Sequence, residues 1–399
     1  MQTESLQTTR IKSVSDLDPF FDSWREIAAG APMLSPEWLL GWWEIYAAPE
    51  DELYVLLFHE PGGALVGLAP LYLQGVEGKA TFRLLGAGDA LTHHLTWLCA
   101  AGWETRVGIE VARFLLECKS SWKRLLFESV DEDAAAIYAT MNCLTENGCL
   151  EHRRQINSCW KIALPATWDD YLRMLSGSLR KRCRKLQRQF FDSGKVQVRQ
   201  VESESDIQEG FEILLKLHAA RWGNARQPLG VFDDQRFRTF HDKVSRKLLA
   251  QKKLRLAWLE FDGRPIAVEY QFVDSKSVYA YQAGVDLSMD EFSPGKLSMM
   301  AAIQFAIAQG CEFFDLLRGD ESYKSNWRAA PMACYDLRVW QDRSMGRVEL
   351  AMWSWYTLAV RRLKTIIPTR FINLGLKLLR ATREACRSLV RGGKISDRP

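Results

Sequence analysis

The chain has 399 residues, of which 47% are hydrophobic and 26% charged, as in an ordinary soluble globular protein. This length predicts two or three domains. No apolar run is long enough to span a membrane, and the first residues lack the apolar core of a signal peptide, so we expect a cytoplasmic protein.

The cysteines and histidines give no sign of a metal centre or of a disulfide framework. None of the nine Cys forms a C-x-x-C pair, and the six His are not spaced as metal ligands. We therefore expect reduced, mostly buried thiols and no metal.

The net charge of +4 is unevenly distributed along the chain. Residues 361–399 carry eleven Lys or Arg and two acidic residues, a balance of +9, which leaves −5 for the first 360 residues. The basic character therefore belongs to the tail.

One order of elements occurs twice along the chain. Residues 53–73 and 254–273 each contain two apolar runs around a Gly-containing turn, which predicts a β-hairpin. Each hairpin follows a Trp-containing helical segment and precedes a helix (104–117 and 296–309) and a strand that ends in acidic residues. The repeat predicts two related α/β halves.

We place the domain boundary near Pro165, where the sequence predicts the start of a new helix. The predicted domains are residues 1–164, 165–345 and 346–399. The last of these is a basic tail with helices around a break at Pro368.

A strongly basic helix is predicted after Ser176 or Ser178, and Gly194 marks its end. Leu179, Cys183, Leu186 and Phe190 form its apolar stripe. Six basic residues without an acid lie between Arg180 and Arg188, and Arg180, Arg184 and Arg188 repel one another at their four-residue spacing. An anion would relieve this repulsion, whereas a merely solvated basic face is the alternative.

The helix predicted after residue 292 has a start suited to a phosphate group. Ser293 is the expected cap and Pro294 the first helical residue, which leaves the amides of Gly295 and Lys296 open. Open amides and the helix dipole favour an anion, and Gly295 allows it to approach closely. Many ordinary helices also begin with Ser-Pro.

Two polar residues lie among apolar neighbours in the second half. Glu269 shares a predicted strand face with Ala267 and Gln271, so it needs a partner or a cleft. It is either a catalytic or substrate-binding carboxylate or a structural one. His218 shares a helix face with Leu214 and Trp222, which is typical of a packed histidine and leaves a substrate-binding role open.

The segment 314–327, FDLLRGDESYKSNW, turns from a buried strand into a polar stretch. In α/β proteins such strand ends line ligand sites, although a solvated loop with ion pairs would have the same composition. Its candidate functional residues are Asp315, Arg318, Asp320, Tyr323 and Lys324.

The ordered set SLRKRCRKLQRQF, LLKLHAARW, GVF, PIAVEYQF, YAYQAGVD, SPGKL and FDLLRGDESYKSNW resembles the GNAT-type acyltransferases. More narrowly, it resembles the CelD-like branch linked to cellulose and exopolysaccharide synthesis, which is related to the FemAB aminoacyltransferases. The resemblance covers roughly 168–340, and the first half is similar in architecture only. It implies an α/β (α+β) fold of two tandem GNAT-like units, each a mixed twisted sheet flanked by helices.

The resemblance also implies an acyl group transferred from a thioester, acetyl-CoA or another acyl-CoA, to an amine of a sugar, amino acid or related metabolite. The cofactor-binding residues would then be Gln282, Ser293, Gly295, Lys296, Arg180 and Arg184. The usual Q/R-x-x-G-x-G/A loop is absent. No activated nucleophile is apparent, so we expect direct attack on the thioester.

Roles follow for the remaining candidates. Glu269 is the first candidate for the base and Asp315 the second, and Tyr323 would protonate the leaving thiolate. The substrate-binding candidates are His218, Arg221, Trp222, Arg318, Asp320 and Lys324.

Two alternatives stay open: a transferase that takes aminoacyl-tRNA as donor, and a non-catalytic accessory protein of a membrane polysaccharide machine. No DNA partner is expected. The basic tail suits peripheral contact with the inner face of a membrane, or else packs on the body.

Overall fold

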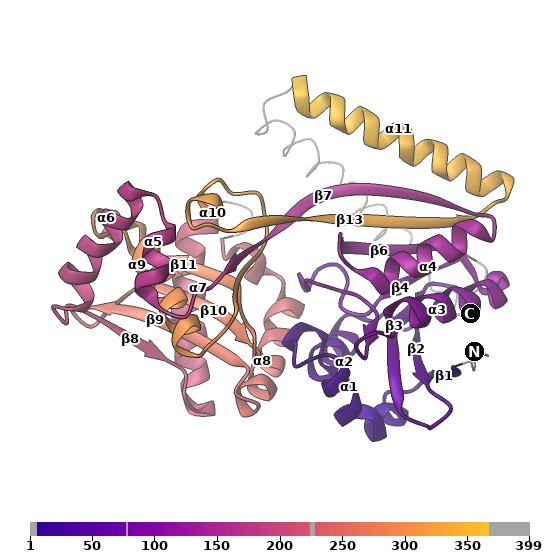
Figure 1. Ribbon diagram of the computed structural model, residues 1–399, viewed down its shortest axis with the longest axis horizontal. Helices are drawn as coiled ribbons and strands as arrows, with labels where there is room; N and C mark the ends of the chain where they lie inside the picture. Colours follow the sequence, from indigo (N-terminus) through magenta and orange to yellow (C-terminus); the bar gives the residue numbers. More distant parts are fainter. Residues whose placement is uncertain (1–5, 77–78, 224–227, 367–399) are drawn as a thin grey trace, which may run out of the picture. The chain divides into compact units, whose positions relative to one another are not determined.

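The computed structural model describes residues 6–366 except 77–78 and 224–227 (Figure 1). These residues form two compact units, one ending at Gln341 and the other starting at Asp342. The second unit contains helix α11 (Ser344–Ile366). The break expected at Pro368 and most of the basic tail lie outside the described residues. Among the helices described, none is both long and apolar enough to cross a membrane.

The first unit contains both predicted halves. The first half consists of β1 (Gln7–Ile11), α1 (Phe21–Ile27), α2 (Pro36–Tyr46), β2 (Glu52–His59), β3 (Leu65–Gln74), β4 (Ala80–Leu84), β5 (Leu98–Cys99), α3 (Glu104–Glu117), β6 (Trp122–Asp131), α4 (Ala135–Glu146) and β7 (Cys149–Ala163). The second half consists of α5 (Trp168–Met174), α6 (Gly177–Leu186), β8 (Val196–Gln200), α7 (Ile207–Trp222), α8 (Gln235–Ala250), β9 (Leu254–Phe261), β10 (Arg264–Val273), β11 (Ser277–Val285), α9 (Pro294–Ala308), β12 (Phe313–Arg318), α10 (Tyr323–Asn326) and β13 (Ala330–Gln341).

The predicted hairpins and crossover helices are present in both halves. β2–β3 and β9–β10 pair antiparallel, and Asp262 and Gly263 turn the second hairpin with φ of 51° and 70°. In each half a helix connects two parallel strands: α3 joins the first half's pair β4 and β6, and α9 joins β11 and β12. The expectation of two tandem GNAT-like units in a mixed α/β fold is therefore confirmed.

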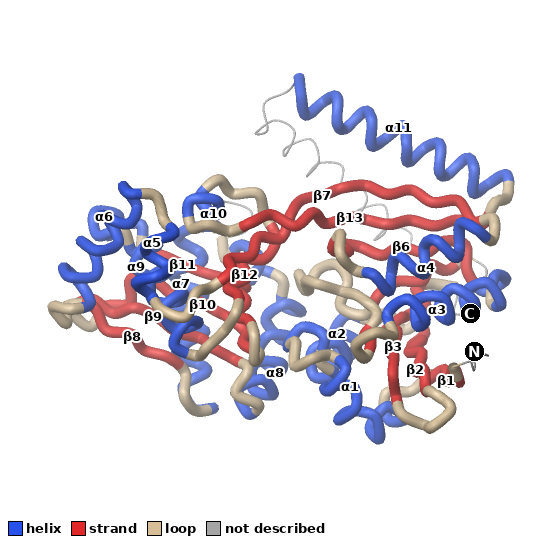
Figure 2. The backbone as a smooth tube through the Cα atoms, in the orientation of Figure 1, coloured by secondary structure: helices blue, strands red, loops and turns tan. Residues whose placement is uncertain are grey.

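All the strands belong to one mixed sheet in the order β1-β2-β3-β4-β6-β13-β7-β12-β11-β10-β9-β8, and β5 pairs with β3 (Figure 2). The last strand of each half pairs with the other half. β7 lies between β12 and β13, and β13 pairs with β6 and β7, so the two long strands run side by side (Figure 1). The division at Pro165 falls between β7 and α5 and stays a prediction, but residues 330–341 complete the sheet of the first half.

Two hydrophobic cores cover the two faces of the second-half strands. One face, with Tyr270 and Phe272, joins the core of the first half and helices α7 and α8. The other packs under α5, α6 and α9. Strict alternation along β10 would place Ile266 on the face of Val268 and Tyr270, but it lies on the other face. A register shift in the β9–β10 pairing between Pro265 and Ala267 places Ile266 in the core under α9.

Candidate functional site

The site is framed by two parallel strands that part. β11 and β12 pair only at Ser277–Phe313, Val278–Phe314 and Tyr279–Asp315, although β11 continues to Val285. Helix α9 connects the carboxyl end of β11 to β12, so its first residues lie at the end where the strands separate. From Ala280 onward the β12-facing edge of β11 has no strand partner among the described residues. Carboxyl ends of separating parallel strands are the usual ligand crevice of α/β folds.

The start of α9 is exposed at Gly295 and Lys296 and differs in two details from the prediction. Ser293 is left-handed, with φ 56°, and its side chain does not cap the helix. The Lys296 amide donates to the Ser293 carbonyl at 2.9 Å, so it is not open as expected. The Gly295 amide makes no hydrogen bond with any described residue. Gly295 and the side chain of Lys296 are exposed, and a Cβ at position 295 would only touch Val285 Cγ1 at 3.8 Å.

The basic helix α6 lies against this start. Ser176 caps α6 by accepting from the Leu179 amide, and Cys183 and Leu186 are buried as predicted. Arg182 reaches Ser293 Oγ at 2.9 Å. Neither Arg180 nor Arg184, the predicted contacts, has an ion pair with any described residue, so both guanidinium groups are available.

Glu269 projects from β10 toward α9. It is half-buried and accepts a hydrogen bond from Ser298 Oγ at 2.7 Å. Burial raises the pKa of Glu269, and the Ser298 hydrogen bond and the charges of Arg255 and Arg221 offset part of the effect. Arg255 is buried and donates to Gln271 Oε1 at 2.6 Å. The Glu269 carboxylate is thus partly shielded from solvent and lies near the charges of Arg255 and Arg221.

Arg221 and Trp222 are exposed, and Tyr323, which is 37% exposed, lies in the same neighbourhood with its phenol partly buried. The Arg221 guanidinium lies 4.8 Å from the centre of the Trp222 ring, which is 47% exposed. Burial raises the pKa of Tyr323 to about 12, and the carboxylates of Glu321 and Glu269 add to this. The charge of Arg221 acts on both Glu269 and Tyr323, which places these residues in one neighbourhood.

His218 and Gln282 form a buried pair at the α7–β11 contact. His218 Nε2 lies 3.2 Å from the Gln282 side-chain amide, and Nδ1 lies 3.2 Å from the Leu229 carbonyl. Burial lowers the pKa of His218, which keeps the imidazole neutral. Helix α7 can approach β11 this closely because Gly284 lacks a side chain. A Cβ at position 284 would lie 2.5 Å from the backbone nitrogen of His218. Both ring nitrogens are engaged, as expected of a packed histidine.

Asp315 lies on the opposite face of the sheet from Glu269. Its neighbours Phe314 and Leu316 pack under α9, so the carboxylate between them faces away from that helix. Asp315 is fully buried and accepts from the Leu317 amide at 2.8 Å.

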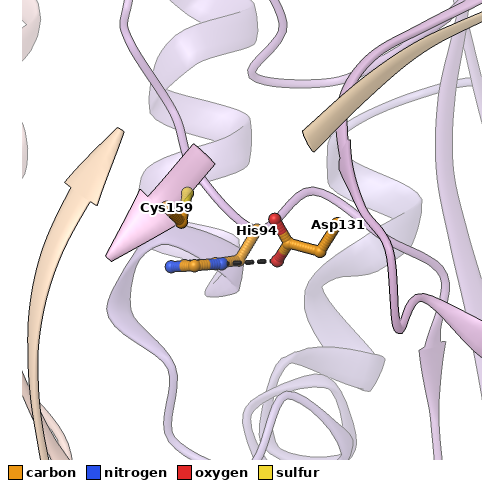
Figure 3. Close-up of side chains that lie close together, drawn as sticks. All are labelled: His94, Asp131 and Cys159. Carbon is orange, nitrogen blue, oxygen red and sulfur yellow. Dashed lines mark hydrogen bonds and ion pairs between the residues drawn. The ribbon is translucent and has the colours of Figure 1, made fainter. Parts of the chain in front are cut away.

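The other contacts of Asp315 come from the first half. His94 Nε2 lies 3.2 Å from Asp315 Oδ2, and Lys161 Nζ lies 3.7 Å from it. His94 Nδ1 contacts Asp131 Oδ2 at 2.6 Å (Figure 3). Burial would raise the pKa of Asp315, but the neighbouring His94 and Lys161 hold it below its usual value. Asp315 therefore does not share a substrate position with Glu269.

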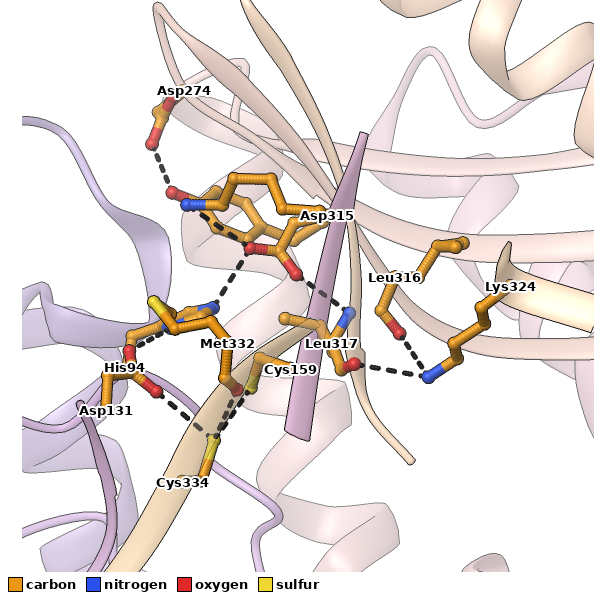
Figure 4. Close-up of polar contacts among 12 residues, drawn as sticks. His94, Asp131, Cys159, Asp274, Asp315, Leu316, Leu317, Lys324, Met332 and Cys334 are labelled. Carbon is orange, nitrogen blue, oxygen red and sulfur yellow. Dashed lines mark hydrogen bonds and ion pairs between the residues drawn. The ribbon is translucent and has the colours of Figure 1, made fainter. Parts of the chain in front are cut away.

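Lys324 does not have a free ammonium group. It is 2% exposed, and the carbonyls of Leu316, Leu317, Arg318 and Gly319 lie 2.9–3.2 Å from Nζ and share its three N–H donors. Figure 4 shows the contacts with Leu316 and Leu317. Lys324 Nζ also lies 3.0 Å from Glu321 Oε2. Lys324 is a substrate-binding candidate from the sequence, and in the structure its N–H donors stabilise the chain turning away from β12.

Arg318 and Asp320 face the first half. Arg318 donates to Ser129 Oγ, and the exposed Asp320 accepts from Trp160 Nε1 at 3.2 Å. Of the predicted residues, the structure thus gathers two groups near the parted strands: the helix start with α6, and Glu269 with Arg221, Trp222 and Tyr323.

Arg182, Ser298 and the buried residues around His94 are site residues that were not predicted from the sequence. Arg182 could have been found, because it lies three residues after Leu179 and four before Leu186, beside the apolar stripe. Ser298 carries no such signal. His94, Asp131, Cys159 and Cys334 come from distant parts of the chain, so no local spacing marks them.

Comparisons with known proteins agree with this geometry. Residues 177–325 match the family model described as an acetyltransferase (GNAT) domain. No curated protein matches the sequence. The crystal structure of FemX is similar with a TM-score of 0.58 at 10% identity, covering 83% of this chain and 96% of that one. A conserved protein of unknown function from Bacteroides thetaiotaomicron VPI-5482 has a TM-score of 0.50 at 11% identity, covering 84% of this chain and all of that one. At these identities the likeness shows a shared fold.

Proposed function

The chain carries a GNAT-type acyltransferase domain, and on this premise we propose that it is an N-acyltransferase that moves an acetyl or other acyl group from coenzyme A to an amine. The observation that carries the proposal is the parting of β11 and β12 beside the exposed start of α9. An extended thioester arm fits between strands whose facing edges are unpaired, and its phosphates fit the helix start.

The donor's phosphates would meet the Gly295 amide, the Lys296 ammonium and α6. A free amide at a helix N-terminus attracts an anion, and the dipole adds to the effect. Arg180 and Arg184 have no acidic partner among the residues that the structure describes, so a phosphate would relieve their mutual repulsion. Arg182 connects α6 to Ser293 and would hold the two phosphate-binding elements together.

Glu269 is the proposed base. The acceptor arrives as an ammonium, which cannot attack until a proton leaves, and a carboxylate whose pKa is raised by burial is better matched to this task than an exposed one. The amine nitrogen then bonds to the thioester carbon while backbone N–H groups on the free edge of β11 stabilise the oxyanion.

Tyr323 would complete the reaction. As the carbon–sulfur bond breaks, the thiolate needs a proton, and the raised pKa of Tyr323 keeps its phenol protonated at neutral pH. Arg221 and Trp222, both exposed near Glu269, would contact the acceptor. An amino sugar, amino acid or related metabolite is proposed as acceptor, in exopolysaccharide or cell-envelope synthesis as in the CelD-like branch.

A second candidate donor is aminoacyl-tRNA. The observation in its favour is the row of basic side chains on α6, which form no ion pair with the described residues and suit a nucleic-acid backbone as well as a coenzyme phosphate. A FemX-like fold is compatible with it.

Calorimetric titration distinguishes a transferase that uses acyl-CoA, a transferase that uses aminoacyl-tRNA and a non-catalytic accessory protein. Saturable binding of acetyl-CoA that is lost in Gly295→Asp and retained in Gly295→Ala supports the proposal. Binding of tRNA with a steep salt dependence, without acetyl-CoA binding, favours the second donor. Binding of neither over a panel of acyl-CoAs rejects both enzymes in favour of the accessory role.

A further inference from the structure

A group of side chains that can bind metals lies where β7 and β13 meet, on the face of the sheet away from Glu269. These two strands each pair with the other half of the chain and are called the exchanged strands below. His94 and Asp131 come from the first half, Cys159 from β7 and Cys334 from β13. One ligand atom each of His94, Asp131 and Cys159 lie within 4.8 Å of one another (Figure 3). Cys334 Sγ lies 3.4 Å from Cys159 Sγ and 3.4 Å from Asp131 Oδ1 (Figure 4).

We propose that these four side chains form a zinc site that fastens the two exchanged strands together. Imidazole, carboxylate and two thiolates are all zinc ligands, and structural sites are four-coordinate. A tetrahedral ion with bonds of about 2.0 Å to N or O and 2.3 Å to S holds its ligand atoms roughly 3.3–3.8 Å apart. The sulfur–oxygen distance of 3.4 Å meets this requirement, and the sulfur–sulfur distance of 3.4 Å is a few tenths of an ångström shorter than two zinc–sulfur bonds of about 2.3 Å require.

The two ring nitrogens of His94 are placed as in a metal-bound histidine. Nδ1 lies 2.6 Å from Asp131 Oδ2, and Nε2 lies 3.2 Å from Asp315 Oδ2. A metal-bound histidine commonly donates its other N–H to a carboxylate, which fixes the tautomer and the ring orientation. Asp315 is fully buried, and neither its Oδ2 nor His94 Nε2 has a hydrogen bond of good geometry within the described residues. Such a bond would form if Nδ1 turned toward an ion.

Cys334 is not among the residues whose ligand atoms all lie within 4.8 Å of one another, so its sulfur must approach the group as an ion binds. The distance between His94 Nδ1 and Asp131 Oδ2 must also increase. At 2.6 Å these atoms share a proton, and an ion in place of that proton requires them to separate by about 0.7 Å. His94 has a left-handed backbone conformation, with a φ of 59°. The nearby residues Ser129 and Leu317 also have positive φ angles, of 59° and 54°. Strained residues of this kind gather at ligand-binding positions.

Two other roles compete for the same atoms. Without an ion, His94 is an imidazolium between two carboxylates, and the burial of both cysteines is ordinary packing. Alternatively, Cys159 and Cys334 form a disulfide, since they lie on adjacent strands with their sulfur atoms in contact. The zinc proposal differs from both in requiring two thiolates and bound metal at once.

The test uses the full-length protein purified with reductant and without chelator. We expect about one zinc ion per chain by elemental analysis. After removal of zinc, Co²⁺ should saturate at one equivalent with an intense near-ultraviolet sulfur-to-cobalt band. Cys159→Ala and Cys334→Ala should each weaken the band and lower metal affinity at least tenfold. Cys311→Ala, which removes a buried cysteine outside the group, should leave both unchanged.

The zinc content, the cobalt band and the intact mass of the wild-type protein test the zinc site even if a variant fails to fold. Substoichiometric zinc together with no cobalt band in protein whose thiols are all reduced overturns the site. So does a Cys159–Cys334 disulfide in the intact mass of protein isolated without reductant, or a band that survives in both folded cysteine variants.

Discussion

Replacement of Gly295 by Asp should abolish donor binding while the fold is kept. At the exposed start of α9, the Gly295 amide makes no hydrogen bond within the described part of the chain, and a phosphate would be held there. A carboxylate about 4 Å from a phosphate costs about 4 kcal/mol per unit charge at an effective dielectric constant near 20. This corresponds to a loss of roughly a thousandfold in affinity.

The same substitution should not damage the protein. An acidic side chain in the first turn of a helix is favoured by about 0.3–1 kcal/mol, and a Cβ at position 295 has room because Val285 Cγ1 lies 3.8 Å away. Gly295→Ala is the matched control, since it adds the Cβ without the charge and gains up to about 1 kcal/mol of helix propensity. Its affinity should stay within about threefold of wild type.

Isothermal titration of acetyl-CoA into the three proteins measures this directly, with thermal unfolding as a check on the fold. The reasoning is refuted if Gly295→Asp binds as wild type, because the phosphate then lies elsewhere. It is equally refuted if Gly295→Ala loses binding as completely as Gly295→Asp, because charge is then not the cause.

Four further outcomes follow from the contacts described. Lys324→Met should lower the free energy of unfolding by at least about 3 kcal/mol in chemical denaturation, because four backbone carbonyls lose their buried donor. Because the base must be ionised, turnover should rise with pH as Glu269 loses its proton, and the midpoint should lie above the ordinary glutamate pKa of about 4.3. Glu269→Gln should remove this acidic limb from the pH–rate profile. Arg182→Ala should weaken calorimetric donor binding more than Arg184→Ala, because only the former contacts the start of α9, and an equal loss would speak against that geometry. Truncation after Gly346 should abolish sedimentation with anionic vesicles at low salt, and a full-length protein that never sediments removes the membrane role.

The local structure could largely be predicted from the sequence. Alternating apolar residues and the Asp262-Gly263 turn define the second hairpin, and Ser-Pro followed by an apolar run defines α9. The hairpin and the helix start depend on residues only a few positions apart, so the local sequence pattern is sufficient to predict them. The repeat of element order was sufficient to predict two halves.

The exchange of β7 and β13 could not be predicted in this way. β13 pairs with β6 and β7, which are far away in the sequence, and nothing within residues 330–341 specifies those partners. The same holds for Asp315, which appeared from its strand to face a substrate. Its environment is set by His94 and Lys161 of the other half. Lys324 likewise looked like a surface cation until its contacts with four carbonyls were known.

The most direct test of the proposed acyl transfer is acceptor-dependent release of free coenzyme A from acetyl-CoA, with a panel of amino sugars and amino acids. We predict thiol release only when an amine is present, a stoichiometric N-acetyl product by mass, and a rate roughly 10²–10⁴ lower in Glu269→Gln with unchanged donor affinity. Donor binding without acceptor-dependent release for any acyl-CoA or amine would contradict the account, as would a stable acyl-protein adduct competent for transfer.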